Sequence, residues 1–110
     1  METYVFDESD WKLFRGRLPE WQEAYMDRLN REYASLLAGP GTTAETFWTL
    51  EKRINTDKHS VGVSARMSRS NMYHNIMSLI YDGVITMDDM KGFSDDLQAT
   101  IAFVMGASEA

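Results

Sequence analysis

The stretch that decides the fold is MSRSNMYHNIMSLIYDGVI, residues Met67–Ile85. Its apolar residues recur at helical steps, which predicts a helix over about Ser68–Tyr81. Asp82-Gly83 closes this helix, because glycine readily adopts the left-handed backbone that a helix end requires. The side chains expected to point inward are Met72, Ile76, Leu79 and Ile80.

The N-terminal part of the chain predicts two helices separated at a proline. A short helix is capped by Ser9 or Asp10 and ends near Gly16. A longer helix begins at Pro19, because the missing N–H of proline is not needed at the first helical position, and it runs to Ala38. One apolar stripe follows the longer helix and consists of Leu18, Trp21, Tyr25, Leu29, Tyr33 and Leu36.

A third helix is predicted after a Gly-Pro-Gly turn, because Thr42 and Glu45 have the spacing of a capping box. Its inner face is expected to consist of Phe47, Leu50 and Ile54, with Trp48 beside them. The segment Asn55–Ser64 is polar and contains Gly62, so we expect a loop there.

Thr86 and Asp89 repeat the capping spacing and predict a fifth helix. Its apolar residues are Met87, Met90, Phe93, Leu97, Ile101 and Val104. Gly92 and Ser94 weaken the middle of this helix, so we expect a kink or a split there. The whole chain therefore predicts an all-α fold, a compact bundle-like single domain of four or five helices over residues 1–110, with an irregular start (1–8) and a frayed end (105–110).

Composition excludes several classes of protein. The 110 residues include no cysteine, which rules out disulfides, thiolate zinc sites and cysteine nucleophiles. The start, METYVFDESD, lacks the basic and apolar regions of a secretory signal, and no apolar run approaches the ~20 residues that span a bilayer. We therefore expect a cytoplasmic location and no membrane contact.

The charge of the chain is uneven along the sequence. A net charge of −6 argues against nucleic acid as a general partner, because phosphate binding depends on basic surface. Residues 61–81, however, contain Arg66 and Arg69 and no acid. The candidate polar or nucleic-acid face consists of Arg66, Arg69, Asn71, His74 and Asn75.

This segment resembles the recognition helix of winged-helix DNA-binding proteins, in which a polar start precedes an apolar helix and a glycine. It departs from that pattern, because a helix and not a β-hairpin is expected after Gly83. DNA or RNA binding through the candidate polar face is therefore the alternative function.

No catalytic, cofactor or metal site is expected. His59 and His74 are the only histidines, and neither has a carboxylate at ligand spacing, whereas zinc needs three or four protein ligands. The residues around Gly83 resemble part of a calcium-binding EF-hand loop, but one required ligand position would fall on Ile80, which has no side-chain oxygen. We expect no enzymatic activity.

The aromatic residues favour a protein partner. Three Trp and eight Met are many for this length, and a small bundle has a limited core in which to bury them. Exposed aromatic and methionine side chains are favoured at partner surfaces. The candidate partner surface consists of Trp11, Trp21, Trp48 and Tyr81.

The segments LPEWQEAYM, FWTLEKRI and MSRSNMYHNIMSLIYDGVITMDDMKGFSDDL resemble a family of short bacterial helical proteins without established biochemistry, mostly from Gram-positive species, over about residues 11–104. The resemblance implies one helical domain in the bacterial cytoplasm and no particular site residue. Some of these proteins carry a multidrug-transporter label, which this sequence does not fit because no segment can span a bilayer. We therefore expect a non-catalytic module that binds a protein partner or associates with itself.

Overall fold

The computed structural model describes the backbone of residues 7–109 and the side chains of residues 7–106. Its helices are α1 (Glu8–Ala38), α2 (Thr43–Asp57), α3 (Val61–Ser64), α4 (Met72–Tyr81), the 3₁₀ helix η1 (Met87–Met90) and α5 (Asp95–Glu109). Residues 7–109 contain no strand, so the predicted all-α class is confirmed. The expected irregular start (1–8) and frayed end (105–110) lie partly outside the described residues, at positions 1–6 and 110. In the described part of these two segments, α1 already begins at Glu8 and α5 continues to Glu109.

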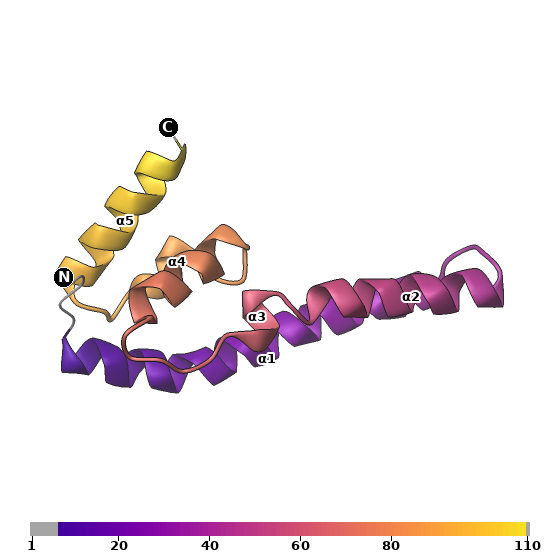
Figure 1. Ribbon diagram of the computed structural model, residues 1–110, viewed down its shortest axis with the longest axis horizontal. Coiled ribbons are helices and arrows are strands. Elements are labelled where there is room, and N and C mark those ends of the chain that lie inside the picture. Colours follow the sequence, from indigo (N-terminus) through magenta and orange to yellow (C-terminus); the bar gives the residue numbers. More distant parts are fainter. Residues whose placement is uncertain (1–6, 110) are drawn as a thin grey trace.

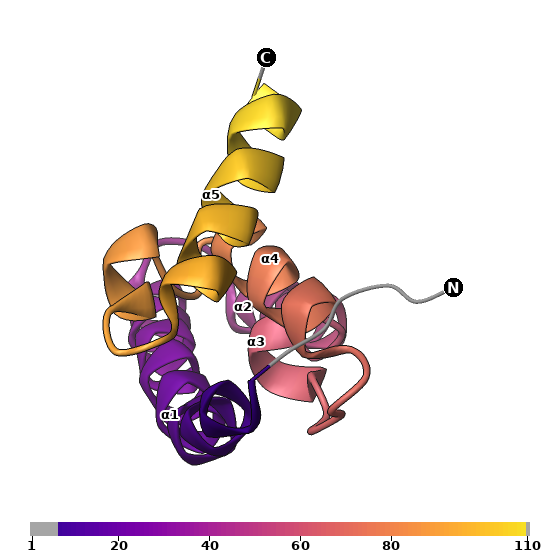
Figure 2. The same ribbon diagram turned by 90° about the vertical axis from the view of Figure 1, so that its left-hand side faces the viewer.

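The molecule has a head and an arm (Figures 1 and 2). We call residues 26–58 the arm: here α2 runs antiparallel to the second half of α1 and extends away from the rest. We call the remaining described residues, 7–25 and 59–109, the head. The molecule is consequently elongated, with extents of 53 × 32 × 26 Å.

The head has one apolar core, where the first half of α1 meets α4 and α5. The largest apolar side chains fully buried in it are Phe14, Leu18, Met72, Ile76, Leu79, Met90, Leu97 and Ile101. The inward direction predicted for the residues of α4 is thereby confirmed, with Ile80 packed partly buried against the same core. Each such side chain stabilises the fold by about 1.5–3 kcal/mol when removed from water.

Helix α1 is continuous, so the predicted break between Gly16 and Pro19 is wrong. The apolar stripe does not begin at Leu18 but continues back through Phe14 and Trp11 at the same steps of three and four residues. All three of these side chains are buried in the head core. Their burial keeps the backbone helical on both sides of Pro19 and offsets the ~3 kcal/mol that a proline costs inside a helix.

The start of α1 joins the start of α5. Asp7, and neither Ser9 nor Asp10, caps α1, because its side chain accepts a hydrogen bond from the Ser9 N–H at 3.0 Å. Asp10 is buried instead, and its carboxylate accepts from the N–H of Ser94 at 2.8 Å and from the Ser94 hydroxyl at 2.6 Å. The Ser94 oxygen in turn accepts from the Leu97 N–H at 3.2 Å, at the first turn of α5.

The segment Asn55–Ser64, predicted as a loop, is largely helical. Helix α2 continues to Asp57, and α3 follows after a short turn. Gly62 in α3 is buried: a Cβ atom there would lie 2.7 Å from a methyl group of Val84 and also against the ring of Tyr25. Glycine is required at this position because α3 approaches α1 closely, which a sequence pattern does not reveal.

The turns after α4 agree with the sequence. Gly83 has a φ of 78°, and the N–H groups of Val84 and Ile85 bond back to the carbonyl oxygen of Leu79 at 2.9 and 3.3 Å. Gly92 has a φ of 98° and separates η1 from α5, which confirms the predicted split. Helix α4 itself is shorter than predicted, since it begins at Met72 and the residues before it form turns.

Candidate interaction surface

The turn into the arm's second helix forms as the sequence predicts. The Thr42 N–H donates to the Glu45 carboxylate at 3.0 Å, and the Glu45 N–H donates to the Thr42 hydroxyl oxygen at 3.1 Å. Gly41, with a φ of 120°, precedes this capping box. After this turn, α2 runs antiparallel to the second half of α1.

Polar contacts join the two helices of the arm. Arg53 pairs with Glu32 at 2.8 Å, and its guanidinium lies 5.5 Å from the centre of the Tyr33 ring. The Tyr33 hydroxyl donates to the Asp57 carboxylate at 2.6 Å. The side of α2 turned toward α1 therefore carries charged groups at Arg53 and Asp57, and most of the apolar residues of α2 lie elsewhere.

These contacts hold the ionisable groups in one protonation state. Burial, together with the hydrogen bond to Asp57 and the charge of that carboxylate, raises the pKa of Tyr33 to about 12. The hydrogen bond to Glu32 raises the pKa of Arg53 above its ordinary value. Both shifts favour the protonated forms, the neutral phenol of Tyr33 and the charged guanidinium of Arg53.

The apolar residues of α2 face water. None of its fifteen side chains, all of which belong to the described residues, is buried. Phe47 is 59% exposed, Ile54 43% and Trp48 62%, and Leu37 on α1 is 55% exposed. The prediction that Phe47 and Ile54 belong to an inner face is therefore wrong, whereas Leu50, the third predicted member, is half-buried.

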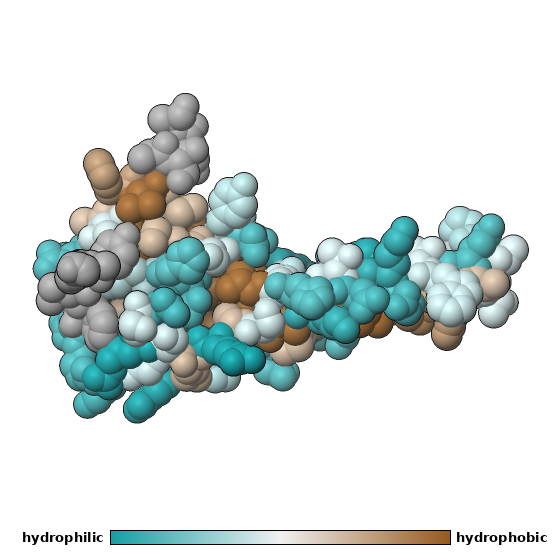
Figure 3. Space-filling view, viewed as in Figure 1, coloured by the Kyte–Doolittle hydropathy of each residue, from teal (hydrophilic) through white to brown (hydrophobic). Residues whose placement is uncertain are grey.

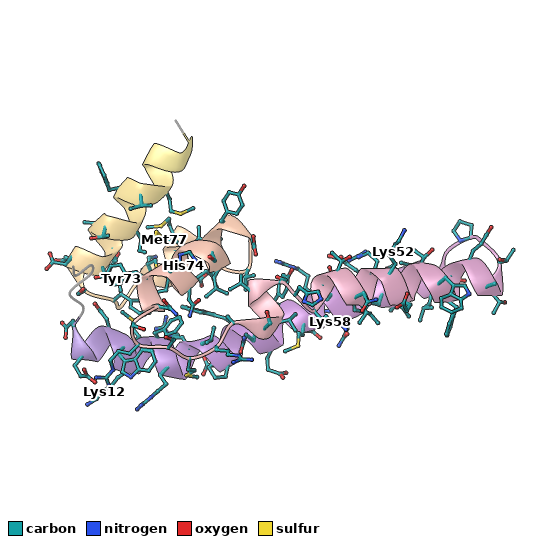
Figure 4. The ribbon with its side chains drawn as sticks, viewed as in Figure 1. Lys12, Lys52, Lys58, Tyr73, His74 and Met77 are labelled. Atoms are coloured by element: carbon teal, nitrogen blue, oxygen red, sulfur yellow. The ribbon has the colours of Figure 1, made fainter. Side chains whose placement is uncertain are left out.

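One side of the arm, which we call the arm face, contains Leu37, Phe47 and Ile54, whereas Trp48 lines a separate hollow with Thr49 and Lys52. Steps of three and four residues place its members on one side of each helix. They are Met26, Asn30, Tyr33 and Leu37 on α1, Ala44, Phe47, Glu51 and Ile54 on α2, and Lys58 at the C-cap of α2. Two shallow hollows of about 290 Å³ each follow this side, and Ile54 lines both of them. Figure 3 shows brown, apolar surface along the lower edge of the arm, and Lys52 points away from that edge (Figure 4).

The four aromatic residues of the candidate partner surface separate into two groups. Trp48 lies on the arm, and Tyr81, at the end of α4, is 79% exposed. Trp11 is buried and Trp21 is partly buried, and their rings lie 6.0 and 6.3 Å from the ring of Phe14. Trp11 and Trp21 thus belong to the head core, because the continuous stripe of α1 turns both inward.

Sequence reasoning missed several exposed apolar side chains, namely Leu37, Phe47, Ile54 and Phe103. A usable signal was present for those on the arm. Arg53, on the predicted third helix, and Asp57, in the predicted loop, have the four-residue spacing of one helix side, and Glu32 and Tyr33 lie on the preceding helix. Such complementary polar pairs indicate that the two helices meet on these sides, which leaves Phe47 and Ile54 exposed.

Folding brings some residues of the candidate polar face into contact with each other or with α1. The Asn75 amide donates to the carbonyl oxygen of Arg66 at 3.0 Å, which ties the turn before α4 to that helix. Arg69 pairs with Glu8 at 2.8 Å, and its guanidinium lies 5.6 Å from the centre of the Trp11 ring. An acid from α1 therefore lies beside the segment that contains none of its own, which reduces the positive potential available to a phosphate.

The other two members of that face lie apart from these contacts. Asn71 is exposed just before α4. His74 lines a hollow of about 510 Å³ on the head, formed between α3, α4 and α5, which His59 also lines (Figure 4). Folding thus brings both histidines to one hollow, although fourteen residues separate them. No group of three or more His, Asp or Glu side chains within the described residues could hold a metal ion.

None of the helices formed by the described residues is both long enough and apolar enough to cross a membrane. Comparison of the chain with family models, curated proteins and solved structures found no match.

Proposed function

We propose that the protein is a non-catalytic interaction module that binds another protein through the arm face. The observation that carries the proposal is the exposure of α2, a helix of fifteen residues with no buried side chain. Covering an exposed apolar side chain stabilises a complex by about 1.5–3 kcal/mol. A partner that covers Phe47 and Ile54 together therefore gains part of this free energy at each of the two positions.

The exposed aromatic residues of the head support binding less strongly. Tyr81 and Phe103 come from different helices, and single exposed apolar residues are common on proteins that bind nothing. The arm face differs because its apolar residues adjoin and line two connected hollows. Contiguous exposed apolar surface is typical of protein interaction sites.

Nucleic-acid binding through Arg66 and Arg69 is the weaker alternative, since Glu8 pairs with Arg69. As part of the proposal we place the protein in the bacterial cytoplasm. That placement rests on the cysteine-free sequence and on the resemblance to short bacterial proteins.

The test is affinity capture from native lysate with the wild-type chain and with a variant carrying Phe47→Ser and Ile54→Ser. Losing two apolar contacts of about 1.5–3 kcal/mol each should reduce recovery of the partner at least ~100-fold. Phe103→Ser is the matched control, because it removes an exposed aromatic side chain of the head. All three chains should give the same circular dichroism spectrum.

Equal recovery by the wild-type chain and the arm variant would contradict the proposal. Recovery that disappears only after nuclease treatment, and that depends on Arg66 and Arg69, would replace it with the nucleic-acid alternative.

A further inference from the structure

We infer that the arm face binds the same face of a second copy of this chain, with the two arms antiparallel in a four-helix bundle. This inference rests on the proposed function, because it names the occupant of the arm face. A C2 pair of hairpins covers the apolar residues of both copies in one step, since such an interface uses the same patch twice.

The distribution of charge along the chain favours contact between two arms. Residues 26–58 contain five acids and five bases, so the arm has no net charge. The rest of the chain contains twelve acids and six bases and therefore carries the whole net charge of −6. Two arms without net charge can therefore approach each other more closely than two heads, which repel each other.

The charge of the heads also selects the antiparallel arrangement. Parallel arms would place two heads, each of net charge −5, at the same end of the bundle. Antiparallel arms place them at opposite ends, beyond the Debye length of about 8–10 Å at ordinary salt. An interface between neutral arms that separates repelling heads should not weaken as the salt concentration rises.

The shape of the arm face suits an antiparallel pair. On the arm face, Ala44 and Lys58 each lie seven residues from Glu51, which corresponds to about 10 Å along the helix. With the two-fold axis beside Glu51, the exposed ring of Phe47 on each copy faces the hollow lined by Ile54 on the other. The projecting aromatic group and the hollow are thus placed at complementary positions by the antiparallel pairing.

The area of the arm face sets the expected affinity. Fifteen residues of α2 give a length of about 22 Å, and two adjacent helices give a width of about 20 Å. The pair would bury on the order of 1,000 Å², which is near the lower limit for a specific interface. We therefore expect a reversible dimer that forms in the micromolar range.

Cysteine cross-linking tests both the occupant and its direction, because the natural chain contains no cysteine. Single variants carry Ala44→Cys, Glu51→Cys or Lys58→Cys on the arm face, and Thr49→Cys, on the opposite side of α2, is the control. A disulfide needs Cα atoms within about 7 Å. Glu51→Cys alone should form a disulfide dimer at least ~10-fold faster than the control.

The direction follows from the two outer positions. Ala44→Cys and Lys58→Cys should cross-link slowly alone and rapidly when the two proteins are mixed. Rapid cross-linking of each one alone would mean parallel arms and would overturn the inferred geometry. No cross-linking of Glu51→Cys beyond the control rate would overturn the inference itself.

Sedimentation equilibrium separates failure of this inference from failure of the proposed function. The wild-type chain should be dimeric at high concentration and the Phe47→Ser, Ile54→Ser variant monomeric. A wild-type chain that stays monomeric, while lysate capture still depends on Phe47 and Ile54, overturns the second copy as occupant and keeps the interaction module. A monomer whose lysate capture is also insensitive to the arm variant overturns both.

Discussion

Replacing Asp10 with alanine tests the contact that joins the start of α1 to the start of α5. Asp10 is 2% exposed, and both of its carboxylate oxygens accept hydrogen bonds from Ser94, a residue 84 positions away. The Ser94 oxygen also accepts from the Leu97 N–H and so helps to begin α5. Asp10→Ala removes both acceptors and leaves the Ser94 N–H without its partner.

The size of the effect follows from these two bonds. A hydrogen bond to a charged group contributes about 1.5–3 kcal/mol, so the pair could contribute roughly 3–6 kcal/mol. Both bonds share one carboxylate, whose removal from water opposes folding, so we expect Asp10→Ala to lower the free energy of unfolding by about 2–4 kcal/mol. For a domain near this size, the midpoint temperature should fall by roughly 10–25 °C.

The assay is urea and thermal denaturation followed by circular dichroism for Asp10→Ala, Ser94→Ala and the double variant. The double-mutant cycle should show a coupling of at least about 1 kcal/mol, because the two residues contact each other directly. Asp96→Ala is the control: it removes an exposed acid from the first turn of α5 and should change stability by less than about 1 kcal/mol. An Asp10→Ala variant no less stable than Asp96→Ala would refute the reasoning.

Two further predictions concern the packing of α3 at Gly62 and the contact between Tyr33 and Asp57 in the arm. Gly62→Ala should destabilise the fold by about 1–3 kcal/mol, because the added methyl group meets Tyr25 and Val84. Urea denaturation should show that the second substitution Val84→Ala recovers part of the lost stability. The pKa of Tyr33 is raised to about 12 from its ordinary value of 10.0, so the protonated phenol stabilises the folded state. This contribution to the free energy of unfolding is complete below pH 10 and is lost as the pH rises through 12. The stability difference between the wild-type chain and Tyr33→Phe should therefore shrink over that window, and a constant difference would show that the phenol is not held by Asp57.

The turns and helix starts could be predicted because they depend on neighbouring residues. The capping box at Thr42 and the positive φ at Gly83 are examples, since the residues that form each turn lie within a few positions. Pro19 shows the opposite case. Its local preference for a helix start is outweighed by burial of Phe14 and Leu18 against helices that follow more than fifty residues later in the chain.

The candidate surface could be predicted only in part for the same reason. A helical period shows that Phe47 and Ile54 share a side, but it does not show whether any other element covers that side. The sequence correctly marked Trp48 as an exposed aromatic residue, and it marked Trp11 wrongly because the extent of the α1 stripe was underestimated. The requirement for glycine at position 62 depends on contacts with two distant segments, which no local pattern contains.

Because α1 is unbroken, a single helix connects the head to the arm without a flexible linker. A helix of 31 residues is about 46 Å long, and it belongs to the head at one end and to the arm at the other. Its weakest position, Pro19, lies inside the head, where packing on both sides prevents bending. The length of this one helix therefore sets the distance between the tip of the arm and the core of the head.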